Sequence, residues 1–192
     1  MKSWQAWNKR LLIALLLGAA SAGMSAAASA AAVLSVSASP NPAVVGTTVD
    51  LSILIDDIDD LYGYQFSLAF DPTVLQATLV TEGDFLAGGG NTSPGIGGID
   101  NATGAVSYVY NTLLGPAAGV SGSGTLAHIR FDVIGVGSTP LTFTDALFLD
   151  SQSAGIEVRI DSTPLQAVPE PATYLMMGVG LVGLAALRRR AV

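Results

Sequence analysis

The strongest constraint on the fold is an alternation of apolar and polar residues with a period of two, repeated through the middle of the chain. It is regular in TVDLSILID (48–56), YGYQFSLAFD (62–71) and TLAHIRFDV (125–133). Successive side chains of a β-strand point to opposite faces, so each stretch predicts a strand with one buried and one polar face. The residues expected to face the core are Val49, Leu51, Ile53, Ile55, Tyr64, Phe66, Leu68, Phe70, Ala127, Ile129, Phe131 and Val133.

Further short stretches of strand-forming residues lie between clusters of Gly, Pro, Asn and Ser. They are VLSVSAS (33–39), TVLQATLV (73–80), AVSYVY (105–110), PLTFTD (140–145), ALFLD (146–150) and GIEVRI (155–160). Eight or nine strands without a convincing amphipathic helix predict an all-β sandwich. Two glycine-rich stretches, 86–98 and 113–124, are predicted loops, and 162–168 is a predicted linker.

The N-terminus has the pattern of a secretory signal peptide. Basic residues at positions 2, 9 and 10 precede the apolar run Leu11–Leu17, and a stretch of small residues follows. This order predicts that residues 1–32 are a signal peptide, removed on export. Cleavage fits after Ala28, Ala30 or Ala32, and Ala30 and Ala32 are preferred.

The C-terminus carries an apolar run of 16 residues, 172–187, between Pro169-Glu170-Pro171 and the cluster Arg188, Arg189 and Arg190. At about 1.5 Å per residue, a helix of this length covers roughly 24 Å of an apolar bilayer core about 30 Å thick. The run predicts a marginal transmembrane helix with the arginines on the cytoplasmic side, which places the middle of the chain outside. The alternative, a buried C-terminal helix of a soluble domain, does not explain three adjacent charges.

The order of Pro-Glu-Pro, apolar helix and arginines resembles the PEP-CTERM sorting signal. The resemblance implies a Gram-negative bacterium that secretes exopolysaccharide, in which the membrane transpeptidase exosortase recognises the tail (168–192) and removes it. The protein would use the secretion machinery, stay in the inner membrane transiently and then reach the cell surface or extracellular matrix. A permanent anchor is the alternative, but the extended Pro-x-Pro segment favours access by a protease.

Residues 33–167, between these signals, have the length of one domain with a substantial core. They contain 12 Asp, 2 Glu and 2 Arg, a formal net charge of −12, against −7 for the whole chain. Such a surface repels nucleic acid and anionic lipid, whereas divalent cations and neutral polymers remain candidate partners. The chain has no cysteine, which excludes thiol catalysis and thiolate metal sites.

The order of features in 33–167 is similar to that of a cohesin module. The resemblance rests on Val44–Leu54, GYQFSLAFDPTVLQATLV (63–80), the glycine loop and GSGTLAHIRFDVIG (122–135), and FDPTVL (70–75) is its most specific part. It implies a non-catalytic, nine-stranded jelly-roll sandwich that binds a dockerin through a sheet face. Several cohesin-like domains outside cellulosomes have no known dockerin, so the partner is open between a dockerin-like protein and an exopolysaccharide. The exposed candidate contact residues are Asp50, Ser67, His128 and Arg130.

Four carboxylates within five residues, Asp56, Asp57, Asp59 and Asp60, are the candidate metal ligands. Oxygen ligands suit Ca²⁺, although the stretch lacks the glycine and the twelfth-position Glu of an EF-hand loop. The alternative is a solvated turn between two strands that discourages edge aggregation. Ca²⁺ is the only cofactor that the sequence suggests.

An enzymatic function has little support in the sequence. A glycoside hydrolase needs two carboxylates, usually in a cleft lined by aromatic rings, and both tryptophans, Trp4 and Trp7, lie in the signal peptide. His128, the only histidine, falls on a polar strand face without a nucleophile beside it. We therefore expect an exported, non-catalytic binding or structural protein. The alternatives are a Ca²⁺-dependent matrix protein without a discrete ligand and a hydrolase that acts on exopolymer.

Overall fold

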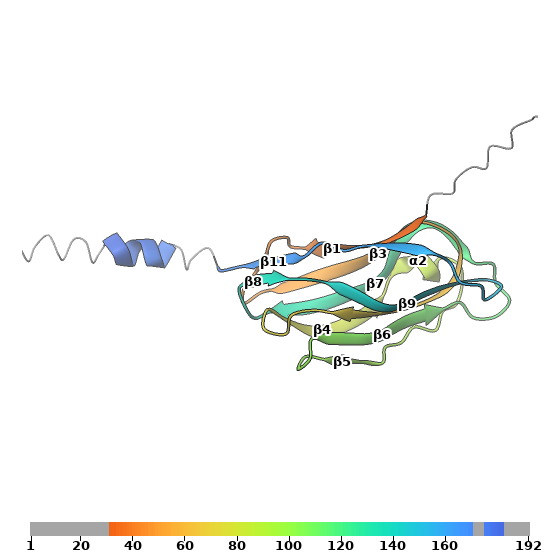
Figure 1. Cartoon of the computed structure of the whole chain (residues 1–192), viewed down its shortest axis with the longest axis horizontal. Helices are drawn as coiled ribbons and strands as arrows, with labels where there is room; N and C mark the ends of the chain where they lie inside the picture. Colours follow the sequence, from red (N-terminus) through yellow and green to blue (C-terminus); the bar gives the residue numbers. More distant parts are fainter. Residues whose placement is uncertain (1–30, 171–174, 183–192) are drawn as a thin grey trace, which may run out of the picture. The chain divides into compact units, whose positions relative to one another are not determined.

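The computed structural model describes residues 31–170 and 175–182 and shows a β-sandwich (Figure 1). The elements in chain order are β1 (Ala32–Ser39), β2 (Ala43–Val44), β3 (Thr48–Ala69), β4 (Leu75–Glu82), α2 (Asp84–Ala87), β5 (Gly98–Asp100), β6 (Ala105–Thr112), β7 (Val120–Val133), β8 (Gly137–Thr139), β9 (Thr142–Asp150), β10 (Val158–Asp161) and β11 (Leu165–Val168). The all-β sandwich predicted from the alternation is confirmed. The strand count is higher than predicted because β2, β5, β8 and β11 have two to four residues each, too few to show an alternation.

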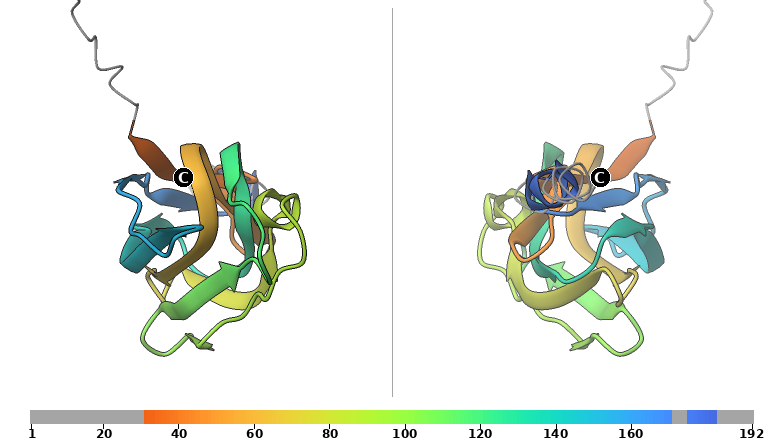
Figure 2. Two further views of the ribbon diagram at one scale, coloured as in Figure 1. Left: turned by 90° about the vertical axis from the view of Figure 1, so that its right-hand side faces the viewer. Right: turned by 90° about the vertical axis from the view of Figure 1, so that its left-hand side faces the viewer.

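The long strand β3 belongs to both layers of the sandwich. Its first part pairs with β1 and β7, and its last part, from Leu61 to Ala69, pairs with β6 and β9. The first layer has the order β10-β1-β3-β7-β4, and the second has the order β5-β6-β3-β9. A separate three-stranded sheet has the order β2-β11-β8. Seen along the strands in Figure 2, β3 curves from one layer to the other.

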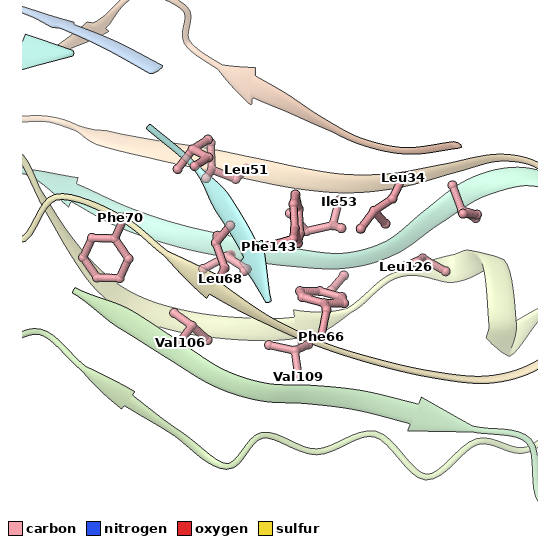
Figure 3. Packing of buried hydrophobic residues seen from close by; sticks show 14 of the residues in the cluster. Leu34, Leu51, Ile53, Phe66, Leu68, Phe70, Val106, Val109, Leu126 and Phe143 are labelled. Carbon is pink, nitrogen blue, oxygen red and sulfur yellow. The ribbon is translucent and has the colours of Figure 1, made fainter. Parts of the chain in front are cut away.

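The core lies between the layers and includes all the residues that the alternation selects. All twelve predicted core residues are at most 6% exposed. Phe66 meets Phe143 edge-on at 5.5 Å between ring centroids (Figure 3). Phe66 also stacks on Tyr64 at 6.0 Å, and Phe70 meets Phe131 at 5.0 Å. Burying a side chain of this size stabilises the fold by about 1.5–3 kcal/mol, so this cluster accounts for much of the packing energy.

The acidic stretch 56–60 is part of β3 and not the predicted turn between two strands. Asp57 and Asp60 have positive φ, 54° and 55°, and the pairing register with β7 shifts at both places. Each shift is a β-bulge, which adds one residue to the strand. The buried residues therefore change from a spacing of two to a spacing of three, at Ile55, Ile58 and Leu61. This break in the alternation mimics the end of a strand in the sequence.

Other boundary predictions were wrong for related reasons. The predicted linker 162–168 contains β11, whose Leu165 and Ala167 are buried. The predicted loop 113–124 ends at residue 119, because the glycine-containing stretch from Val120 pairs with β3. Residues 142–150, from the two predicted stretches 140–145 and 146–150, form the single strand β9, despite a positive φ at Asp145.

At the C-terminus, residues 175–182 are helical, inside the predicted run 172–187. The remainder of the run lies outside the described residues, as does the predicted signal peptide up to Ala30. Within the ranges that the structure describes, no helix is long and apolar enough to cross a membrane.

Candidate functional site

The outer face of the second layer carries a row of side chains across three strands. Gln65 of β3 lies opposite Tyr110 of β6 on one side and opposite Leu147 of β9 on the other. Tyr110 and Leu147 are 44% and 46% exposed, although both are large and largely apolar. Beside the row, Gly63 is one of the residues lining a hollow of about 180 Å³. We call Gly63, Gln65, Tyr110 and Leu147 the tyrosine face.

Two local features give the tyrosine face its form. Gly95 pairs with Tyr110 through two backbone hydrogen bonds of 2.9 Å, and its missing side chain leaves room for the Tyr110 ring. A bulge between Phe66 and Leu68 places the Ser67 hydroxyl where it accepts a hydrogen bond from the Tyr108 N–H at 3.1 Å. Ser67 is thereby 8% exposed, so the prediction that it is an exposed contact residue is wrong.

The other three predicted contact residues lie together on the outer face of the first layer. Arg130 donates two hydrogen bonds to the Asp50 carboxylate, at 2.8 and 3.2 Å, and His128 Nδ1 lies 3.2 Å from the Ser52 hydroxyl. The hydrogen bond from Arg130 to Asp50 and the charge of Asp50 raise the pKa of Arg130. This face is exposed, as predicted, and Arg130 pairs with Asp50 and His128 with Ser52 within it.

A third candidate is a pocket of about 200 Å³ at the edge of the sandwich, between β4 and β6. The Tyr64 hydroxyl, at its inner end, donates to the Leu126 carbonyl at 2.5 Å. Glu82 Oε1 accepts hydrogen bonds of 2.6 Å from the Thr92 hydroxyl and from Asn111 Nδ2. Burial and the neighbouring charge of Glu82 raise the pKa of Tyr64 above its usual range. The lining residues are Tyr64, Val80, Thr81, Glu82, Pro94, Gly95, Ile96, Val109, Tyr110 and Ala127.

Sequence reasoning did not identify this edge pocket. Glu82, Thr92 and Asn111 come from three separate segments, and only the pairing of strands brings them together. The one available signal was Glu82 itself, one of two glutamates in 33–167, at the end of an alternating strand.

Two of the four predicted Ca²⁺ ligands, Asp59 and Asp60, accept hydrogen bonds from neighbouring segments. Asp60 accepts hydrogen bonds from the Gly119 N–H at 2.9 Å and from the Ser151 hydroxyl at 2.7 Å, and Asp59 accepts one from the Ser121 hydroxyl at 2.5 Å. Among the described residues, no three His, Cys, Asp or Glu side chains converge to hold a metal ion. A Ca²⁺ site at Asp56, Asp57, Asp59 and Asp60 stays a prediction from the sequence.

The predicted sorting residues begin where the sandwich ends. Pro169 and Glu170 follow β11 directly, and the last strand residue, Val168, accepts a hydrogen bond from the Val45 N–H at 2.9 Å. Pro171, Arg188, Arg189 and Arg190 lie outside the described residues.

Comparisons with known proteins agree with both resemblances. The cohesin domain family matches residues 34–163, and the PEP-CTERM protein-sorting motif matches residues 167–190. No curated protein matches the chain significantly.

Several solved cohesin structures share the fold. A chain of a type II cohesin–X-dockerin complex from Acetivibrio cellulolyticus is 17% identical, with a TM-score of 0.58 over 71% of this chain and 99% of that one. The second type II cohesin module of an adaptor scaffoldin from the same organism is 20% identical, with a TM-score of 0.59 over 72% and 98%. A non-cellulosomal cohesin from the archaeon Archaeoglobus fulgidus is 18% identical, with a TM-score of 0.55 over 77% and 98%.

The matched family covers more than half of the chain, and the sandwich has the architecture of the solved cohesins. The chain therefore belongs to the cohesin domain family and carries a C-terminal PEP-CTERM sorting motif.

Proposed function

We propose that this chain is an exported, non-catalytic binding protein that recognises a protein partner through the tyrosine face. The observation that carries the proposal is the row Tyr110–Gln65–Leu147, in which two large side chains are about half exposed on the outer face of the second layer. Tyrosine at the centre of an exposed apolar patch is typical of protein interfaces, because it buries a large area at a small cost in side-chain entropy. Gln65, which lies between the two large side chains, supplies a polar group that can orient a partner through hydrogen bonds.

The charge of the domain indicates the chemistry of the partner. With a net charge of −12 over 33–167, the sandwich attracts a basic surface and repels an acidic one. One of the similar solved structures is a complex with a dockerin, which supports a protein rather than a sugar as partner. An exopolysaccharide stacked on exposed Tyr108 and Tyr110 is the second candidate, favoured by the exposure of both rings.

The proposed function includes export and processing of the chain at both ends. Residues 1–30 would be removed first, and we favour cleavage after Ala30 over Ala32, because Ala32 is buried in β1 and paired with Val158. Exosortase would then act near Pro169, Glu170 and Pro171, with the helix and Arg188–Arg190 holding the tail in the inner membrane. Because Pro169 follows β11 without a spacer, the mature protein would be the sandwich alone, at the cell surface or in the matrix.

A capture experiment tests the proposed face. The domain 31–168 is immobilised and exposed to the extracellular fraction of its host, and retained proteins and polysaccharides are identified. Tyr110→Ala and Leu147→Ser should each abolish capture of the specific partner. Asp50→Asn on the opposite face is the matched control and should leave capture unchanged. Capture that survives both face variants but is lost with the control would move the site to the first layer.

A further inference from the structure

We propose that the edge pocket is a specificity site that takes one lysine or arginine side chain of the partner, with Glu82 as its counter-charge. The proposal rests on the proposed binding function and deepens it. Tyr110 links the two places, because it belongs to the tyrosine face and also lines the edge pocket. A partner on the face can therefore reach the pocket without a second docking surface.

The charge inside the pocket favours a cation. Glu82 is the only Asp, Glu, Lys, Arg or His among the lining residues. The two arginines of 33–167 pair elsewhere, Arg130 with Asp50 and Arg159 with Asp161. The Glu82 carboxylate is held in place by Thr92 and Asn111, which both donate to Oε1, and neither donor brings a full positive charge. A partly buried carboxylate without a cation is stabilised by a ligand that supplies one.

The walls of the pocket favour an alkyl stem over a sugar. Val80, Ile96, Val109 and Ala127 supply apolar surface, and the Tyr64 hydroxyl is already committed to the Leu126 carbonyl. A sugar ring needs several free hydrogen-bonding groups, whereas a lysine or arginine side chain needs apolar walls and one acceptor for its charged end. A volume of about 200 Å³ accommodates one such side chain.

Small probes test the pocket without the partner. The domain 31–168 is titrated with Nα-acetyl-lysine amide, and with Nα-acetyl-norleucine amide as the uncharged control, while the methyl NMR signals of Val80, Ile96 and Val109 are followed. We expect saturable shifts with a dissociation constant of about 1–10 mM for the lysine probe, and binding about tenfold weaker for the norleucine probe. Glu82→Gln keeps an acceptor for Thr92 and Asn111 and should remove the preference for lysine. Equal binding of both probes, an unchanged preference in Glu82→Gln, or no saturable shift up to about 20 mM overturns the proposal.

The outcome is separable from that of the capture experiment. If the domain does not bind the lysine probe but capture still depends on Tyr110, the pocket proposal is rejected and the binding role of the tyrosine face stands. If the domain binds the lysine probe but capture does not depend on Tyr110 and Leu147, the pocket proposal stands and the tyrosine face is rejected as the binding surface.

Discussion

The ring of Tyr110 lies directly over Gly95, and a Cβ atom built on Gly95 would come within 2.5 Å of the ring's Cζ. The backbones of the two residues are joined by a reciprocal pair of hydrogen bonds of 2.9 Å. The Tyr110 ring can lie in this position because Gly95, in the neighbouring segment, has no side chain.

Gly95→Ala should therefore displace the Tyr110 ring and weaken partner capture, with little loss of stability. The contact is with the far end of a flexible side chain, so the fold can adjust at a cost of about 1 kcal/mol. Capture strength and thermal unfolding of the variant measure the two effects. Gly98→Ala, where an added Cβ meets nothing within 4 Å, is the control. Unchanged capture by Gly95→Ala would argue against a role of the Tyr110 ring.

Leu165→Ala should destabilise the sandwich by about 2–5 kcal/mol, because it leaves a cavity beneath β11. Leu165 is 2% exposed although the sequence places it beside the sorting tail. Urea unfolding of domain 31–168 measures the loss. Gln166→Ala on the exposed side of the same strand should cost much less. Equal, small effects of both variants would mean that β11 is not part of the folded unit.

Asp60 should contribute stability that is lost in acid. Its hydrogen bonds from Ser151 and Gly119 lower the pKa of Asp60 below its ordinary value of 3.8. A carboxylate with a depressed pKa stabilises the fold above the unfolded pKa and loses this contribution as the pH falls through the folded pKa. Asp60→Asn should lower the urea midpoint at neutral pH and flatten its decline below about pH 4. Asp57→Asn, at the neighbouring bulge, is the control, and an identical acid profile in both variants would contradict this role.

Millimolar Ca²⁺ should leave the melting temperature of the domain unchanged relative to chelator. The carboxylates of Asp59 and Asp60 accept hydrogen bonds from Ser121, Ser151 and Gly119, which a bound cation would have to replace. A ligand that binds only the folded state raises the melting temperature in proportion to its saturation. A rise in melting temperature that Asp59→Asn abolishes would instead support the Ca²⁺ site predicted from the sequence.

The sequence predicts the parts of the fold that depend on local periodicity. The alternation at 48–56 and 62–71 identifies the large core residues of β3 within those two stretches, because side-chain direction in a regular strand depends only on position along the chain. It misses the buried Ile58 and Leu61, which lie in the bulged segment between them. It does not predict that β3 continues through Asp57 and Asp60, because a bulge and a turn produce the same break. Short strands such as β11 cannot be predicted from the sequence for a related reason. They form because neighbouring strands pair with them, and their own residues show no strand pattern.

The binding sites are predicted less well than the fold. The polar face with Asp50, His128 and Arg130 can be predicted from the sequence, because these residues alternate with the buried residues of the same strands. The tyrosine face depends on which strands neighbour β3. In β6, the positive φ of 48° at Tyr108 moves the buried position from Val106 to Val109, an odd spacing that leaves Tyr108 and Tyr110 exposed and that no alternation would predict. Glu82 acquires its neighbours only through long-range pairing, so no local pattern indicates the edge pocket.

The most direct test of the account is a hydrogen-exchange footprint of the mature domain with the partner recovered by capture. The account predicts protection of backbone amides in β6 (105–112), in β9 (142–150), in the segment around Gly95 and at the end of β4 beside the edge pocket (80–82), with the rest of the first layer unchanged. Protection centred instead on β7 and the first part of β3, around Asp50, His128 and Arg130, would contradict the assignment of the binding face.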